Sequence, residues 1–245
     1  MRKPKKANEP KPVSAGICRI PLLPDEMVVT PVTPIKMNEI TWRIFRIMAE
    51  FVEGFQFLSE FGREVTIFGS ARLTRDDHWY KEARKLGTLL ANCGFTVITG
   101  GGPGIMEAAN RGASEGGGES VGINIQLPME QRINPYVKKG RGFHYFFTRK
   151  VMLAASAQAY VFFPGGFGTL DEMFEMITLV QTEKTQRVPI VLVGKKFWGP
   201  LMDWIDHMLV TEGEISQKDT KLYHLVDTAD EAFAIVEVSK DRTFF

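Results

Sequence analysis

The chain has 245 residues, of which 44% are hydrophobic and 24% charged, a composition typical of one large globular domain. Its 30 basic and 29 acidic residues leave a net charge of +1, which argues against a general nucleic-acid-binding surface. No apolar run approaches the ~20 residues of a membrane span, and neither the interrupted N-terminal region nor the two cysteines point to secretion. We expect a cytoplasmic protein without membrane contact.

Residues 1–37 are rich in proline and begin with a basic stretch, a composition that resists both helix and sheet. We interpret this segment as a tail rather than as an arm that binds a partner or a nucleic acid. In residues 38–61, apolar side chains recur at helical spacing on more than one stripe. This pattern predicts an N-terminal helix that is buried on most sides, either against its own domain or against a second subunit.

In residues 62–245, short apolar runs alternate with helical patterns. The apolar runs predict strands at 65–68, 95–99, 121–127, 143–147, 159–163, 188–193 and 222–226. The helical patterns fall at 79–92, 105–115, 148–157, 170–180, 198–210 and 229–238. This alternation predicts an α/β fold: a single Rossmann-like, doubly wound, mostly parallel sheet with helices on both faces, preceded by the N-terminal helix.

Four of the predicted strand-to-helix joints carry glycines or unusual charges, at 69–72, 100–104, 148–150 and 165–172. In a doubly wound sheet, ligands bind outside the carboxyl ends of the strands, and all four joints open at that edge. Their coincidence predicts a ligand site more strongly than any single motif does. In the first joint, Gly69, Ser70 and Arg72 are candidates for binding an anion.

The joint at 165–172 has the residues of a phosphate site. Its glycines, Gly165, Gly166 and Gly168, leave backbone N–H groups uncovered at the start of a helix, where the helix dipole favours an anion. Thr169 and Glu172 follow, and they also spell the T-x-x-E capping box, which is a purely structural explanation for both. In a first helical turn Glu172 is favoured in its ionised form, which suits a base or a stabiliser of positive charge rather than a general acid.

Arg149 and Lys150 are predicted in the first turn of a helix, where two cations oppose the helix dipole. One interpretation is that they face a phosphorylated ligand, because the planar guanidinium fork matches phosphate or sugar oxygens. The alternative is that they reach solvent or pair with carboxylates such as Glu172.

The joint at 100–104 predicts a tight turn into the next helix. Gly101 and Gly102 are candidate ligand contacts, and Glu107 either reaches the ligand or lies on an exposed helix surface. The spacing G-x-G-x-x-E lacks the third glycine of the dinucleotide fingerprint, and the strand at 121–127 ends without an acidic residue, which argues against NAD or FAD. The four histidines are scattered and predict no metal site. We therefore expect neither a cofactor nor a metal.

Three motifs together resemble the LONELY GUY (LOG) family of nucleoside 5′-monophosphate phosphoribohydrolases, long mislabelled as lysine decarboxylases. They are Pro164-Gly165-Gly166-x-Gly168-Thr169-x-x-Glu172, Arg149-Lys150 and Thr99–Gly104. The resemblance covers about residues 65–238. It implies hydrolysis of the N-glycosidic bond of AMP or an N6-modified AMP to the free base and ribose 5-phosphate. It also implies that Arg149 and Glu172 are catalytic, that the glycine loop and Thr169 bind the phosphate, and that the protein forms homodimers or dimer-based assemblies.

Phe147 departs from the family pattern, because many members have a histidine two residues before the arginine. The N-terminal extension is also absent from short plant-type members, and both departures leave the preferred base open. One alternative function is a non-catalytic binding protein for a nucleotide or phosphorylated cofactor, of the molybdenum-cofactor-carrier type. Another is a pyridoxal-phosphate decarboxylase, for which Lys150 is the only lysine near the predicted site. The presence of both Arg149 and Glu172 favours the hydrolase.

Overall fold

The computed structural model describes residues 37–126 and 133–241. The chain divides into two units, Met1–Ile40 and Thr41–Phe245, and in the first unit only the beginning of a helix is described. The predicted proline-rich tail therefore lies outside the described residues, except for Met37. The sheet and the helices that cover it belong to the second unit.

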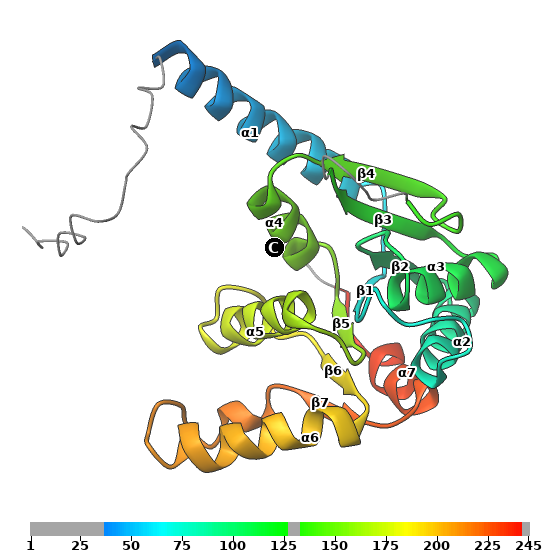
Figure 1. The fold of residues 1–245 in the computed structure, drawn as a ribbon, viewed down its shortest axis with the longest axis vertical. Helices are drawn as coiled ribbons and strands as arrows, with labels where there is room; N and C mark the ends of the chain where they lie inside the picture. Colours follow the sequence, from blue (N-terminus) through cyan, green and yellow to red (C-terminus); the bar gives the residue numbers. More distant parts are fainter. Residues whose placement is uncertain (1–36, 127–132, 242–245) are drawn as a thin grey trace, which may run out of the picture. The chain divides into compact units, whose positions relative to one another are not determined.

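Within the described residues, seven parallel strands form one sheet in the order β4-β3-β2-β1-β5-β6-β7 (Figure 1). Their bounds are β1 Glu64–Phe68, β2 Thr96–Thr99, β3 Ser120–Ile125, β4 Lys139–Phe143, β5 Ala159–Phe162, β6 Ile190–Val193 and β7 His224–Val226. The chain builds outwards from β1 to β4 and then returns to place β5 on the other side of β1. The strand order therefore reverses between β1 and β5, the position at which such sheets bind ligands.

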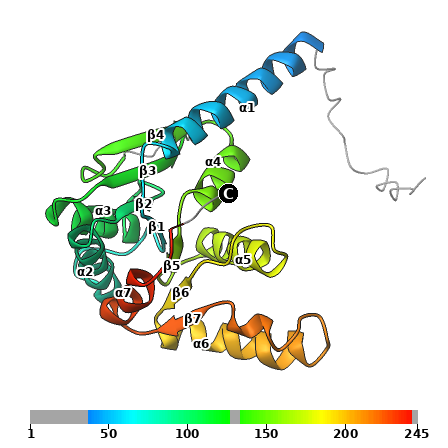
Figure 2. The same cartoon turned by 180° about the vertical axis from the view of Figure 1, so that it is seen from behind.

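Helices cover both faces of the sheet (Figure 1 and, from behind, Figure 2). α2, α3 and α7 pack on one face, and α4, α5, α6 and the end of α1 pack on the other. Their bounds are α1 Met37–Leu58, α2 His78–Asn92, α3 Ile105–Glu115, α4 Phe146–Ala155, α5 Phe167–Gln181, α6 Lys195–Trp204 and α7 Ala229–Glu237. A π-helix, Ile205–Val210, continues α6, and a 3₁₀ turn, Asp219–Lys221, precedes β7.

The central strands are buried on both faces. Along β5, Val161 packs in the core beneath α2, α3 and α7, whereas Tyr160 and Phe162 pack in the core beneath α4, α5 and α6, and all three are fully buried. A strand buried in this way needs apolar residues at every position, which is why the strands are continuous apolar runs in the sequence. The predicted doubly wound α/β fold with an N-terminal helix is confirmed.

The predicted strand at 143–147 is wrong. The strand is β4, Lys139–Phe143, and Phe146 begins α4. The aromatic residues after Phe143 have high strand propensity, but Phe146 and Phe147 lie half exposed in the first turn of the helix. β4 is glycine-rich and polar, yet it pairs with β3 along its whole length, so pairing with a neighbouring strand outweighs propensity here.

The first helix differs from its prediction in burial. Phe51, Phe55 and Leu58 pack on the core, but the side chains nearer its start are exposed, with Trp42 at 67% and Phe45 at 55%. Within this chain the helix is therefore not buried on most sides. Among the helices of the described ranges, none combines the length and the apolarity that crossing a bilayer requires.

Candidate functional site

A cavity of about 760 Å³ opens at the carboxyl ends of the strands, where the strand order reverses. Its walls come from the joints after β1, β2 and β5 and from α4 and α5. Eight of the predicted site residues line it: Gly69, Ser70, Arg72, Arg149, Gly166, Gly168, Thr169 and Glu172. The co-location of the joints at one edge, expected from the sequence, is thus present in the structure.

The start of α5 presents free backbone donors to this cavity. The helix begins at Phe167 with Gly166 as its N-cap. The N–H groups of Thr169 and Leu170 donate to the Gly166 carbonyl at 3.0 Å, but among the described residues those of Phe167 and Gly168 have no backbone acceptor. Both residues line the cavity, and unpaired N–H groups at a helix N-terminus attract anions.

Gly165 shapes this turn without lining the cavity. A Cβ on Gly165 would lie 2.1 Å from Thr169 Oγ1, so the close approach of Thr169 requires a glycine. A Cβ on Gly168, in contrast, would meet nothing within 4 Å, which leaves open space above the free donors. The glycines of the loop therefore have different physical roles, and only some of them face a ligand.

The capping-box interpretation of Thr169 and Glu172 is wrong. Because α5 begins at Phe167, Thr169 is its third residue and Glu172 its sixth, too far along the helix to cap it. A capping box does occur in the chain, between Thr228 and Glu231 at the start of α7. Helix capping thus offers no structural explanation for a carboxylate at position 172.

Glu172 is buried, with 6% of its surface exposed, and it lines the cavity. Burial, with repulsion from Glu175 one helical turn further on, raises the pKa of Glu172 to about 8, while Lys150 and Arg149 act to lower it. The expectation that the helix dipole keeps Glu172 ionised is therefore wrong. Near neutral pH this carboxyl group holds a proton and is able to donate it.

Arg149 also has a different setting from the predicted one. α4 begins at Phe146, so Arg149 is the fourth residue, and Thr148 is inside the helix rather than its cap. The Arg149 Nε donates to the Ile123 carbonyl at 2.9 Å, and a Cβ on Gly100 would lie 2.5 Å from Arg149 Nη2. Burial lowers the pKa of Arg149, and the neighbouring Glu172 carboxylate opposes that shift. Arg149 and Glu172 therefore line the same cavity and interact electrostatically.

Lys150 does not line the cavity. Its Nζ lies 2.7 Å from Asp171 Oδ2 and 3.4 Å from Glu175 Oε2, which ties α4 to α5. Burial acts to lower the pKa of Lys150, but the hydrogen bond that Lys150 donates to Asp171 and the charges of Glu175 and Glu172 raise it overall. A lysine kept protonated in this way is a poor Schiff-base nucleophile, which argues against the pyridoxal-phosphate decarboxylase.

The joint after β2 contributes mainly structure. Gly101 has φ +71°, its N–H donates to Thr99 Oγ1 at 2.9 Å, and its carbonyl accepts from the Asn134 N–H at 2.9 Å. The carbonyl of Gly102 accepts from Asn134 Nδ2 at 3.0 Å. Neither glycine lines the cavity. Asn134 was missed because its two glycine partners lie more than 30 residues earlier in the chain, and no local pattern reveals them.

Glu107 faces away from the cavity. Its Oε1 accepts from Arg75 Nε at 3.1 Å, from Arg75 Nη2 at 2.9 Å and from the Tyr80 hydroxyl at 2.9 Å. The sequence also missed apolar residues that line the cavity, namely Phe68, Met106, Ile125, Phe146, Phe167 and Leu170. The signal that was available is the exposed phenylalanine within the glycine loop, Phe167, since 91% of its surface is accessible and folding alone gives it little burial.

Comparison with known proteins relates this chain to a group of hydrolases. The family model described as "Possible lysine decarboxylase" matches residues 106–236. The cytokinin riboside 5′-monophosphate phosphoribohydrolase LOG of Oryza sativa subsp. japonica is 31% identical over 178 residues, which cover 71% of this chain and 72% of that protein. The cytokinin riboside 5′-monophosphate phosphoribohydrolase of Rhodococcoides fascians is 26% identical over 157 residues, covering 63% and 79%.

Solved structures share the fold. The X-ray structure of TM1055, a structural-genomics target, is 27% identical with a TM-score of 0.55 and covers 71% of this chain and 98% of that one. The molybdenum cofactor carrier protein of Chlamydomonas reinhardtii is 23% identical with a TM-score of 0.53, covering 71% and 95%. At 23% identity, the likeness to the carrier protein concerns the fold alone.

Proposed function

Because this chain belongs to the LOG family, we propose that it hydrolyses the N-glycosidic bond of a purine nucleoside 5′-monophosphate, either AMP or an N6-modified AMP. The products are the free base and ribose 5-phosphate. One observation carries the proposal: a buried, protonated Glu172, the cation of Arg149 and the free N–H groups at the start of α5 line one cavity. An acid, a cation and an anion site are the groups that this reaction requires.

The phosphate is bound at the start of α5. Phe167 and Gly168, with their free N–H groups, and Thr169 line the cavity, and so do Ser70 and Arg72 from the joint after β1. Helix N-termini and arginine side chains are the groups that proteins use for phosphate. Binding energy from this non-reacting group lowers the barrier to cleavage when it holds the ribose in the reactive position. The apolar side chains of Met106, Ile125 and Phe146 offer a surface for the flat base.

Cleavage needs a proton for the departing base and negative charge for the ribose, which becomes cationic at its anomeric carbon. Protonated Glu172 donates its proton to the base and becomes a carboxylate beside the ribosyl cation. That carboxylate then takes a proton from water as the hydroxide adds to the anomeric carbon, which restores the starting state. Arg149 favours the ionised form of Glu172 that arises midway and keeps the nucleotide in position.

Release of base and ribose 5-phosphate from purified protein tests this proposal. We expect release from AMP or an N6-modified AMP, and far less from adenosine, which lacks the phosphate. A panel of nucleoside monophosphates identifies the preferred base. Tight binding of nucleotides without release of product would indicate instead a binding protein of the carrier type, whose fold this chain shares.

We also propose that two copies of the chain associate. On α1, Trp42, Phe45 and Val52 are exposed, and on the adjoining α4 so are Phe146 and Phe147. The two helices meet where the Glu50 carboxylate accepts from the His144 N–H at 2.6 Å and from the Thr148 hydroxyl at 2.5 Å. An apolar surface of this kind is typical of an interface between subunits.

Light scattering after gel filtration tests the association. A dimer is expected for the native chain, and the double variant Trp42→Glu/Phe45→Glu is expected to be a monomer. Phe197→Glu, at an exposed phenylalanine on α6, is the matched control and leaves the dimer intact. A monomeric native chain would remove this proposal without touching the proposed reaction.

A further inference from the structure

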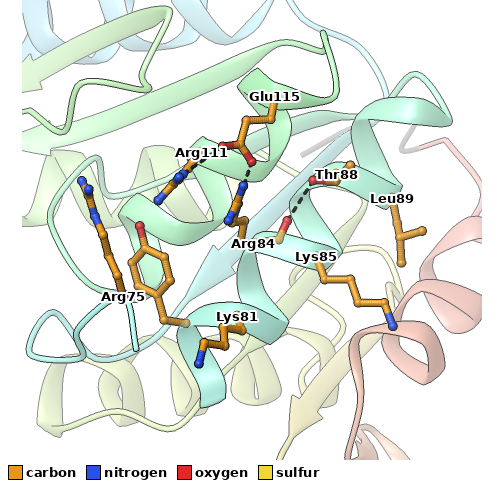
Figure 3. A pocket seen from close by; sticks show the side chains of 9 residues that line it. Arg75, Lys81, Arg84, Lys85, Thr88, Leu89, Arg111 and Glu115 are labelled. Carbon is orange, nitrogen blue, oxygen red and sulfur yellow. Dashed lines mark hydrogen bonds and ion pairs between the residues drawn. The ribbon is translucent and has the colours of Figure 1, made fainter. Parts of the chain in front are cut away.

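A second cavity, of about 500 Å³, lies between α2 and α3 (Figure 3). These helices cover the face of the sheet opposite α4 and α5, and the two cavities share no lining residue. Five side chains in its lining are cationic, and one, Glu115, is acidic; the cations are Arg75, Lys81, Arg84, Lys85 and Arg111. We call this cavity the α2–α3 groove.

Glu115 holds two of the arginines side by side. Its Oε2 accepts from Arg84 Nε at 2.6 Å and its Oε1 from Arg111 Nε at 2.9 Å (Figure 3). The hydrogen bond from Arg84 is the main cause that lowers the pKa of Glu115, so this carboxylate stays ionised and keeps both guanidinium groups in place. Each arginine uses its inner nitrogen for this contact, which leaves the terminal nitrogens of Arg84 without a partner among the described residues.

Positive charge exceeds negative charge in the groove. Glu115 is the one acidic side chain in the lining, whereas Arg75 pairs with Glu107 and Lys85 with Asp230. The carboxylates of Asp77 and Glu82 also interact electrostatically with Lys81 and Lys85. Lys81 has no ion pair within the described part of the chain. The side chains of Lys81 and Arg84 are exposed and therefore accessible to a ligand.

The order of residues in α2 concentrates this charge. Lys81, Arg84 and Lys85 fall at positions i, i+3 and i+4 of the helix, so they lie on one face and repel one another. Lys81 is also the fourth residue of α2, close to the positive end of the helix dipole. Helix stability alone favours an acidic residue at position 81 and disfavours three cations on one face, and an anionic ligand accounts for their presence.

We propose that the α2–α3 groove is a second anion site, which binds a small molecule with a di- or triphosphate chain. Paired guanidinium groups and an ammonium group match the oxygens of such a chain in charge and geometry. The cavity has the size of a small-molecule site rather than that of a macromolecular interface.

The segment after β1 connects this groove to the catalytic cavity. Gly69–Arg72 line the catalytic cavity, and Arg75, three residues later, lines the groove. The same segment is fixed at its start, since the Ser70 N–H donates to the Pro164 carbonyl at 3.0 Å and the Ser70 carbonyl accepts from the Ile105 N–H at 3.0 Å. A ligand that draws Arg75 away from Glu107 pulls on the segment that carries Gly69–Arg72, and through this segment we expect it to affect nucleotide binding in the other cavity. This coupling rests on the proposed function, whereas binding in the groove does not.

Calorimetric titration with tripolyphosphate tests the binding, with ribose 5-phosphate present to occupy the catalytic phosphate site. We expect one equivalent to bind, and the double variant Lys81→Ala/Arg84→Ala to weaken binding roughly tenfold or more. Lys196→Ala, at an exposed lysine of α6, is the matched control and leaves the affinity unchanged. Equal affinity in the double variant and the native chain, or no binding to either, would overturn the proposal.

Two further arms sharpen the result. Glu115→Gln removes the carboxylate that holds Arg84 and Arg111 side by side, so we expect it to bind tripolyphosphate more weakly, whereas unchanged or tighter binding by a variant that melts normally would count against the proposal. ATP serves as the second probe: affinity equal to that of tripolyphosphate identifies the phosphate chain as the ligand, and higher affinity adds a nucleoside contact. These readouts stand whether or not the protein hydrolyses AMP. If it does, tripolyphosphate changes the KM for AMP in the native chain and not in the double variant.

Discussion

The carboxyl groups of Glu172 and Glu175 lie one helical turn apart on α5, and their repulsion adds to burial in raising the pKa of Glu172 to about 8. Glu175 also approaches Lys150 on α4, so its negative charge is partly balanced while that of Glu172 has to form next to it. This relationship makes Glu172 a proton donor near neutral pH, and the proposed reaction depends on it.

Glu172→Gln is expected to lower turnover of AMP by about 10²-fold or more, because glutamine has no proton to donate and no negative charge to offer the ribosyl cation. Release of ribose 5-phosphate measures this loss. Thr228→Ala is the matched structural control, since it breaks the capping box of α7. We expect that control to cost about 1 kcal/mol of stability and to leave turnover unchanged. A fully active Glu172→Gln variant would contradict the assignment.

The pH profile of kcat/KM reports the proton on Glu172. The native chain is expected to lose activity as the pH rises through about 8, because the carboxyl group then has no proton to donate. Glu175→Gln removes the neighbouring negative charge, lowers the pKa of Glu172 and shifts this decline to lower pH. An unchanged decline in Glu175→Gln would show that another group titrates.

Stability also depends on pH through Glu172. Its pKa is near 4.5 in the unfolded chain and about 8 in the folded one, so between these values the folded state holds a proton that the unfolded state has lost. The free energy of unfolding therefore falls as pH rises from 4.5 to 8 and levels off above that. Urea unfolding of Glu172→Gln should lack this contribution, so the variant gains stability relative to the native chain as pH increases. A constant difference between the two proteins across that range would contradict the raised pKa.

Arg149→Lys is expected to reduce turnover by roughly tenfold or more although the charge is kept. Lysine has no Nε–H to donate to the Ile123 carbonyl and no planar fork, so the cation is no longer held in position. Steady-state kinetics with AMP measure the change. Lys150→Ala, which breaks ion pairs outside the cavity, is expected to affect stability more than turnover. A larger loss of turnover in Lys150→Ala than in Arg149→Lys would contradict the roles proposed for these two residues.

The sequence predicts the sheet and the place of the site well, because both follow from local patterns: the apolar runs mark the strands, and the glycine joints mark the edge where the site lies. The start of α5 shows where such reasoning stops. Its position is set by the packing of Thr169 on Gly165 and by the burial of the helix, and a shift of three residues turns Glu172 from a capping residue into a buried acid. The predictions for β4 and for Glu107 were wrong or incomplete for the same reason, since each depends on a partner distant in the sequence: β3 for β4, and Arg75 for Glu107.

Gly100 matters when members of the family are compared. It leaves room for the guanidinium of Arg149, and a single methyl group there would occupy the space of Arg149 Nη2. A relative with alanine at this position keeps every charged residue of the motif, yet the end of its arginine side chain has to shift to make room. Sorting active members from inactive ones therefore requires attention to the smallest side chain near the cavity as well as to the reactive ones.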